Sequence, residues 1–175
     1  LITGHEVTGI TLTASTTNAT QNGTITPKDA VIKDGSNNTV TDNYNITYNT
    51  GKLIINKIDN TLTVTAKTNL TYNESAQELV TASNPQGDVY YNVGTELTSS
   101  NYSTSGSKTI PTKTNAGTYK VYYYTPGNTN YNSKSGNVSV TISKKASSCE
   151  IDNVPTLVYP GTPSGNITYE CTGDG

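Results

Sequence analysis

The sequence predicts an all-β protein built from serial two-layer modules, and three observations carry this prediction. First, several landmarks recur 87 positions apart: Asn43-Tyr44-Asn45 returns as Asn130-Tyr131-Asn132, Lys57 as Lys144, and Leu70-Thr71-Tyr72 as Leu157-Val158-Tyr159. Second, short runs of alternating apolar and polar residues are separated by turn residues, as in β-strands. Third, no stretch keeps a period near 3.6 without Gly, Pro or β-branched interruption. A repeat of this length predicts tandem β-domains rather than a solenoid of small units.

The repeat also predicts where the modules begin and end. Residues 58–145 form one complete module. Residues 1–57 resemble only its later part, so a first strand is expected to be missing there, and residues 146–175 resemble only its beginning. A sandwich that lacks a strand exposes an unpaired backbone edge. The terminal modules are therefore expected to be disordered, completed by another chain, or continuous with further sequence.

In the complete module, alternation predicts strands over residues 61–66, 77–82 and 88–93, with a strong turn signal at Asn84-Pro85-Gln86-Gly87. The polar segment 96–106 is expected to be a loop. Residues 108–111 are expected to form a short edge strand, because Pro111 cannot donate a hydrogen bond to a sheet.

The strongest local pattern lies in the second half of this module. A small-residue turn at 115–117 precedes a long strand through Tyr124, which places Tyr119, Val121 and Tyr123 on one face. Tyr119 is the candidate for a tyrosine corner, in which a Tyr hydroxyl bonds to upstream backbone. The last strand is expected over residues 136–143. About seven strands in this order predict an immunoglobulin-like (Ig-like) connectivity, and the chain as a whole reads as tandem Ig-like β-sandwich domains whose terminal ones are incomplete.

The first module repeats the ending of the second. Strands are expected over residues 39–41, 43–48 and 52–57, with a hairpin turn at Asp34-Gly35. Strand follows strand without a crossover helix.

Specific segments also resemble a known class of repeat. The segments AGTYKVYYY, LTYNESAQELV and DNYNITYNTGKLIINK resemble the bacterial Ig-like (MBG-type) stalk repeats of large Gram-positive cell-surface proteins, and are similar to repeats of adhesin-like proteins from methanogenic archaea. The likeness covers residues 58–144 well, 1–57 in their later part and 146–175 loosely. It implies an extracellular spacer or display module attached to a cell wall or S-layer. The partners implied are neighbouring repeats of the same polypeptide, and a host surface protein or glycan bound through a distal domain.

Composition limits the classes of function. Apolar residues make up 31% of the chain, with no Phe, Trp or Met, so each core must be thin and rely on Val, Ile, Leu and Tyr. There is no Arg and the 11 Lys residues are dispersed, which argues against nucleic-acid binding. No run approaches 18 apolar residues, so no membrane span is expected in this segment.

The two cysteines, Cys149 and Cys171, lie in runs that read as two strands able to pair. An even number of Cys residues in a chain of extracellular character favours a disulfide. The alternative is two reduced, unrelated thiols, and a zinc site is not expected without a neighbouring histidine.

N-glycosylation sequons are abundant, and their use depends on the host. They begin at Asn18, Asn22, Asn37, Asn45, Asn69, Asn73, Asn101, Asn137 and Asn166.

No catalytic, cofactor-binding or metal site is expected. The single histidine, His5, has no motif-placed nucleophile or carboxylate partner. Two minor alternatives stay open, each with its residues: calcium at Asp29, Asp34 and Asp42, or an isopeptide crosslink between Asn137 and one of Lys52, Lys67 or Lys120.

Exposed tyrosines form a third alternative, a contact patch for carbohydrate or protein, although packing is the favoured role for Tyr in a chain without Phe or Trp. The candidates are Tyr90, Tyr91, Tyr122, Tyr124 and Tyr131.

The expected function is a non-enzymatic extracellular spacer, stalk or display segment of a large adhesin-like surface protein. Two alternatives come from other classes. One is an Ig-like structural or decoration component of a phage virion. The other is a subunit of an extracellular filament that self-assembles by strand complementation.

Overall fold

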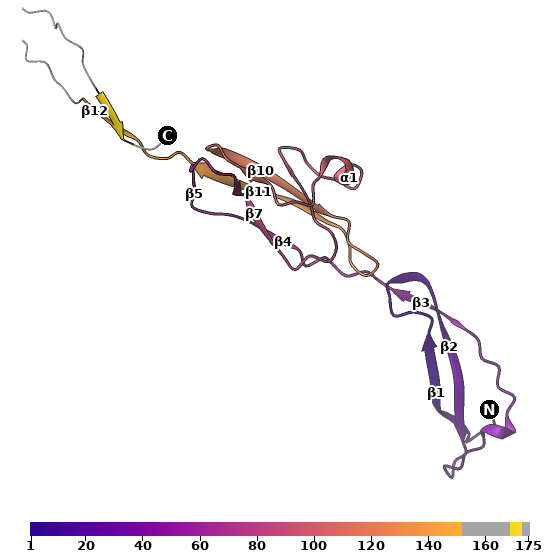
Figure 1. Ribbon diagram of the computed structural model, residues 1–175. Coiled ribbons are helices and arrows are strands. Elements are labelled where there is room, and N and C mark those ends of the chain that lie inside the picture. The colour runs from indigo at the N-terminus through magenta and orange to yellow at the C-terminus, as the bar shows by residue number, and fades with distance from the viewer. Residues whose placement is uncertain (152–168, 173–175) are drawn as a thin grey trace, which may run out of the picture. The chain divides into compact units, whose positions relative to one another are not determined.

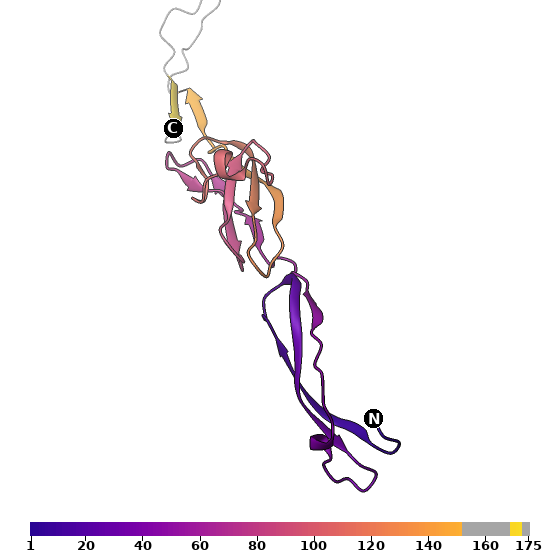
Figure 2. The ribbon, with the colours of Figure 1, turned by 90° about the vertical axis from the view of Figure 1, so that its right-hand side faces the viewer.

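The computed structural model of the chain (Figures 1 and 2) describes residues 1–151 and 169–172. About half of them lie in strands and very few in helical turns, which confirms the predicted all-β class. By Cα proximity the chain divides into two compact units. The first comprises residues 1–61, 86–88 and 125–134, and the second comprises residues 62–85, 89–124 and 135–175.

The first unit contains one antiparallel sheet in the order β1-β2-β3. Its strands are β1 (Glu6–Ala14), β2 (Thr20–Lys33) and β3 (Gly51–Ile55). The long β1-β2 hairpin has register shifts near Gly9, opposite the part of β2 where Asp29 adopts a left-handed conformation with φ of 51°. Such irregularities bend a strand and re-aim the side chains beyond them.

The segment that returns from β2 to β3 is not the strand predicted over residues 43–48. It contains a short 3-10 helix, η1 (Thr41–Asn43), followed by extended chain outside the sheet. The Tyr48 hydroxyl accepts a hydrogen bond from the Ala30 amide at 2.9 Å, and Thr41 Oγ1 accepts one from the Ile32 amide at 2.9 Å. Side chains thus satisfy backbone donors of β2 that a paired strand would otherwise satisfy. The predicted hairpin turn at Asp34-Gly35 is confirmed, since Lys33 bridges to Thr39 across it.

Up to Ser143, the second unit contains a four-stranded sheet in the order β5-β11-β10-β8 and two separate strand pairs, β4-β7 and β6-β9. The bounds of these strands are β4 (Thr63–Ala66), β5 (Leu70–Thr71), β6 (Gln77–Glu78), β7 (Val80–Ser83), β8 (Tyr90–Val93), β9 (Thr112–Lys113), β10 (Gly117–Thr125) and β11 (Lys134–Ser143). β5 joins β11 in parallel, with Ile142 opposite Leu70.

The core of this unit lies between two layers of strands. The four-stranded sheet contributes Val121, Val140 and Ile142, and the β4-β7 pair contributes Val64 and Val80. Val121 and Val80 are fully buried, and Val140 is 1% exposed. This packing agrees with a β-sandwich, while the Ig-like connectivity stays a prediction.

A smaller aromatic cluster packs outside that core and corrects the list of exposed tyrosines. The segment predicted to be a loop over 96–106 contains one helical turn, α1 (Tyr102–Ser105). The Tyr102 ring stacks on Tyr124 and meets Tyr90 edge to face, with ring centroids 4.8 Å apart in each pair. Tyr124 is only 8% exposed and Tyr91, in the main core, only 5% exposed. The prediction of exposure is therefore wrong for Tyr91 and Tyr124.

The predicted edge strand also lies further along the chain than expected. The pairing strand is β9, after Pro111 rather than before it, and it pairs with β6. Pro111 contributes its carbonyl oxygen, which accepts a hydrogen bond from the Leu79 amide at 3.0 Å. Because proline has a carbonyl acceptor but no amide donor, it is tolerated at the end of a strand pairing, where only an acceptor is needed.

The C-terminal described residues form a strand pair of their own. β12 (Ser148–Ile151) pairs with β13 (Tyr169–Thr172) in antiparallel register, with Cys149 opposite Cys171. These two cysteines form a disulfide, as predicted from their flanking runs.

Candidate functional site

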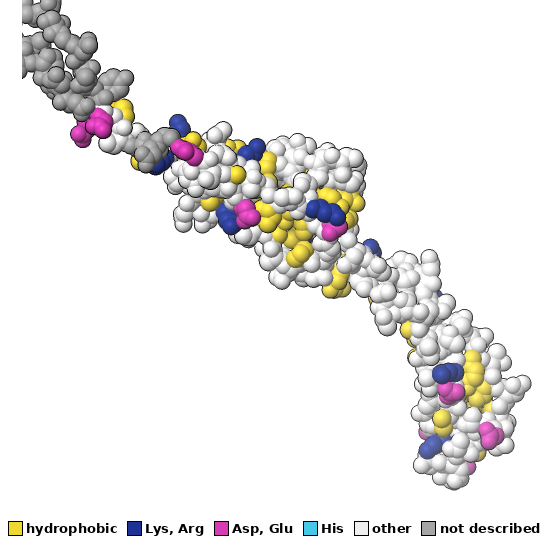
Figure 3. Space-filling view, viewed as in Figure 1, with side chains coloured by type: hydrophobic (Ala, Val, Ile, Leu, Met, Phe, Trp, Pro, Cys, Tyr) yellow, Lys and Arg dark blue, Asp and Glu magenta, His cyan; other side chains and the backbone are white. Residues whose placement is uncertain are grey.

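The first sheet has one apolar face, which is defined by its register. Leu12 pairs with Pro27, Ile25 with Gly51, and Gly23 with Leu53. Successive residues of a strand point to opposite sides, so one side presents Leu12, Ile25, Pro27, Leu53 and Ile55, here called the apolar face. The intervening positions are Thr11, Thr13, Thr24, Thr26, Lys28 and Lys52. Figure 3 shows hydrophobic side chains at the surface of this unit.

The described chain covers this face only in part. Leu12 is 57% exposed, and the other four members are half-buried. The repeat provides an internal comparison, because Leu53 and Ile55 lie 87 positions before Val140 and Ile142. Val140 and Ile142 are each 1% exposed, since the β4-β7 pair packs over them. Equivalent repeat positions are thus fully covered in the second unit and only partly covered in the first.

The β12-β13 pair is the repeat counterpart of β4-β7. In β4-β7, Thr63 lies opposite Ser83 and Val64 opposite Ala82. Moved by 87 positions, these become Glu150 opposite Glu170 and Ile151 opposite Tyr169, which are the pairings found in β12-β13. The two pairs therefore share one register.

An amide-rich loop is bound to the β1-β2 turn within the first unit. The Ala19 amide donates to Asn130 Oδ1 at 2.8 Å, and Asn130 Nδ2 donates to Asn18 Oδ1 at 3.0 Å. Lys57 Nζ donates to the Asn128 carbonyl at 2.8 Å, and Ile58 forms a β-bridge with Tyr131. Side-chain amides can donate and accept at once, so Asn130 links two segments that are far apart in the sequence.

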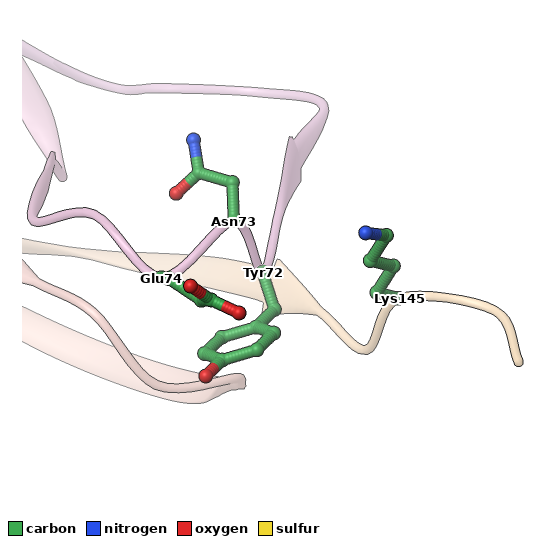
Figure 4. Close-up of a pocket in the computed structure, with 4 residues that line it drawn as sticks. All are labelled: Tyr72, Asn73, Glu74 and Lys145. Carbon is green, nitrogen blue, oxygen red and sulfur yellow. The ribbon is translucent and has the colours of Figure 1, made fainter. Parts of the chain in front are cut away.

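A shallow polar cavity of about 260 Å³ lies beside the end of β5, lined by Tyr72, Asn73, Glu74 and Lys145 (Figure 4). The Asn73 side chain points away from Glu74 and the Tyr72 ring, and Lys145 stands on the other side of the turn. This arrangement does not bring an acid, a base and a nucleophile to one point, as catalysis requires.

His5 lies at one end of the first sheet, where its Nδ1 is 2.8 Å from the Tyr44 hydroxyl. In the neighbouring turn, Asp34 accepts hydrogen bonds from the Asn38 side chain and from the Asn38 and Ser36 amides. These bonds, the Asn38 side chain first, hold the pKa of Asp34 below its usual value, and the charge of His5 adds to the effect. These contacts indicate that His5 and Asp34 stabilise the local structure of this turn region.

Among the residues weighed for calcium and for an isopeptide crosslink, Asp29 and Lys67 form ion pairs. Within residues 1–151 and 169–172, no group of three or more His, Cys, Asp or Glu side chains could hold a metal ion. Asp29 lies 3.7 Å from Lys28 Nζ, and Lys67 Nζ lies 3.4 Å from Glu78.

The sequons differ in how accessible their asparagines are. Asn101 is half-buried, and its side chain both donates to the Glu96 carbonyl and accepts from the Thr98 amide. Asn18 is exposed but bonded to Asn130, and Asn166 lies outside the described residues. The remaining six are exposed: Asn22, Asn37, Asn45, Asn69, Asn73 and Asn137.

Tyr119 makes the hydrogen bond that the sequence led us to expect. Its hydroxyl donates to the Asn115 carbonyl, four residues upstream, at 2.8 Å. The bond ties the start of β10 to the turn before it.

Comparison with known proteins adds no relative: no protein-family model, curated protein or solved structure matches the chain. No helix in the described part of the chain is long and apolar enough to cross a membrane.

Proposed function

We propose that this chain is a non-catalytic extracellular segment of serial Ig-like modules, acting as a spacer, stalk or display element of a large cell-surface protein. The observation that supports it best is the recurrence of one strand pair, β4-β7 and β12-β13, in the same register 87 residues apart. Recurrence at a fixed period is how a polypeptide extends reach by adding units. The Ig-like connectivity and the surface location rest on the sequence resemblance.

Two further features support the proposal. The Cys149–Cys171 disulfide requires an oxidising compartment to persist, and such compartments include the cell surface. Within the first unit, the bonds of Asn130 to residues 18 and 19 join segments that are far apart in the sequence, which supports an ordered module.

The proposed spacer function predicts that the chain is stiff in solution. We expect small-angle scattering of the monomeric chain to give a single narrow distribution of dimensions. The matched variant is Asn130→Ala, which removes both side-chain bonds of Asn130 and should broaden that distribution, whereas Asn132→Ala removes only a bond to exposed Asp59. A wild-type chain that bends freely in solution would argue against the spacer function.

A further inference from the structure

We infer that Tyr102 and Tyr124 form a site of oxidative modification, at which a one-electron oxidant couples their rings into a dityrosine bond. The oxidant is of the peroxide-driven class, such as a haem peroxidase with hydrogen peroxide. Both residues lie in the second unit. Because the reactivity follows from the stacking of two rings, it does not depend on the spacer function.

The composition of the chain makes tyrosine the main target of such an oxidant. The sequence has 13 Tyr and no Trp or Met, and its two Cys residues are joined in the disulfide. Free thiols and thioethers, which are readily oxidised in proteins, are thus not present as competitors. An electron lost from this chain to the oxidant therefore comes mainly from a phenol ring.

The relation of the two rings distinguishes Tyr102 and Tyr124 from the other described tyrosines. Their centroids are 4.8 Å apart at an interplanar angle of 21°, whereas Tyr102 meets Tyr90 at 72°. Aromatic pairs usually have centroids about 4.5–7 Å apart, so this stack is a close one. A bond between two ring carbons forms from p orbitals that stand perpendicular to the ring planes. The near-parallel pair is therefore aligned to react, and the edge-to-face pair is not.

Contacts on both sides hold this stack in place. Tyr124 in β10 lies directly opposite Tyr90 in β8, and the Tyr102 ring contacts both of them. At the end of α1, the Ser105 carbonyl accepts a hydrogen bond from Asn92 Nδ2 of β8 at 2.6 Å. Groups that are held together in this way react as if at very high concentration. Coupling inside the stack should therefore be faster than coupling between chains.

The oxidant needs access to only one of the two rings. Tyr102 is half-buried, whereas Tyr124 is only 8% exposed. Because stacked rings in contact exchange electrons rapidly, a radical formed on Tyr102 can pass to Tyr124. Tyr102 is then oxidised a second time, which places one radical on each ring.

Coupling removes two electrons and two protons from the pair. Each phenol loses one electron to the oxidant and its hydroxyl proton to water, which gives a phenoxyl radical. One ortho carbon of Tyr102 then bonds to one ortho carbon of Tyr124. The hydrogen on each of these carbons leaves as a proton while each oxygen takes up a proton, so both rings become phenols again. Hydrogen peroxide accepts the two electrons and, with two protons, becomes two molecules of water.

The bond would fasten α1 to β10. α1 is a single helical turn without a buried residue, and such segments open readily. A covalent link to a central strand restricts this opening. Oxidation should therefore order the segment that carries Tyr102.

The test is peroxidase treatment of the full chain at high dilution, followed by measurement of intact mass and dityrosine fluorescence. We expect a fluorescent product that stays at the 18.5 kDa of one chain and is lighter by two hydrogen atoms. Peptide fragmentation should place the bond between Tyr102 and Tyr124. The amides of α1 should also exchange hydrogen more slowly than in the untreated chain.

Three variants, each retaining a ring, identify the reacting residues. Tyr102→Phe and Tyr124→Phe each leave a ring in the stack but remove its phenol, so each should abolish the product. The matched control is Tyr90→Phe, which changes a ring that contacts Tyr102 only edge to face and should leave the yield unchanged. Treatment of the wild type in urea, where the stack is lost, should spread the coupling over many tyrosines.

Three results would overturn the inference. The first is a treated wild-type chain without dityrosine inside the single chain. The second is a product that persists in both Tyr102→Phe and Tyr124→Phe, which would indicate that another pair reacts. The third is loss of the product in Tyr90→Phe, which would show that the edge-to-face ring is the one that couples.

Discussion

Ile55 and Ile142 are the same residue at equivalent repeat positions, and truncating each one measures how well its face is covered. Ile142 is 1% exposed. Ile142→Ala removes three carbons, a transfer loss of about 2.4 kcal/mol at roughly 0.8 kcal/mol per carbon. The cavity left in the close-packed core raises the expected loss to about 3.5 kcal/mol, inside the usual range of about 2–5.

Ile55→Ala should cost less, because Ile55 is only half-buried. With no enclosed cavity and a smaller transfer loss, we expect about 1–1.5 kcal/mol. The difference of about 2 kcal/mol corresponds to roughly 30-fold in the local opening equilibrium. Native-state hydrogen exchange of β3 and β11 amides, measured at concentrations where the chain is monomeric, reads each unit separately.

The control is Ile54→Ala on the other side of β3, where the side chain is 51% exposed and the loss should stay within about 0.5 kcal/mol. Equal losses for Ile55→Ala and Ile142→Ala would show that the first sheet is as well covered as the second. The reasoning about its apolar face would then be wrong.

Three further predictions concern single interactions. Tyr119→Phe removes the hydrogen bond to the Asn115 carbonyl and should lower the free energy of unfolding of the second unit, measured in urea, by about 1 kcal/mol. An unchanged free energy of unfolding would mean that a hydrogen bond to water is as favourable for this hydroxyl. Reducing Cys149–Cys171, which closes a loop over a separation of 22 residues, should cost the β12-β13 pair about 3 kcal/mol by loop entropy, seen as faster hydrogen exchange of its amides. The pKa of Asp34 is lower in the folded state than in the unfolded state, so the ionised carboxylate stabilises the turn above the unfolded pKa, and this stabilisation is lost as pH falls through the folded pKa. In an NMR titration, the chemical shifts of the turn amides should therefore change together with that of the Asp34 carboxyl. Asp34→Asn should abolish this change.

The sequence predicted those features that depend on local pattern. Alternation located β10 and β11, and the two Cys-containing runs predicted both the β12-β13 pairing and the disulfide. The Tyr119 hydrogen bond was predictable because a turn before a strand places a tyrosine hydroxyl near upstream carbonyls.

The features that were missed depend on contacts between distant segments. Burial of Tyr124 requires the Tyr102 ring, which comes from a segment so polar that it read as a loop. The strand predicted over residues 43–48 does not form. Instead, the Tyr48 hydroxyl accepts a hydrogen bond from the Ala30 amide of β2, 18 residues away in the sequence. The apolar face of the first sheet had a partial signal, since alternation in 52–57 was visible, but its incomplete burial becomes evident only by comparison with the buried Ile142.

The position of the disulfide links the order of the β12-β13 pair to the chemistry of the surroundings. Cys149 and Cys171 replace the repeat positions of Leu62, which is fully buried in the second unit, and Asn84. Where a neighbouring layer supplies burial, an apolar side chain suffices to fix two strands. In the β12-β13 pair a covalent bond joins the two strands instead, which restricts the conformations that they can adopt when they separate. Thiol reductants should therefore loosen this strand pair and leave β4-β7, which contains no cysteine, unchanged, so that redox potential controls one repeat and not the other.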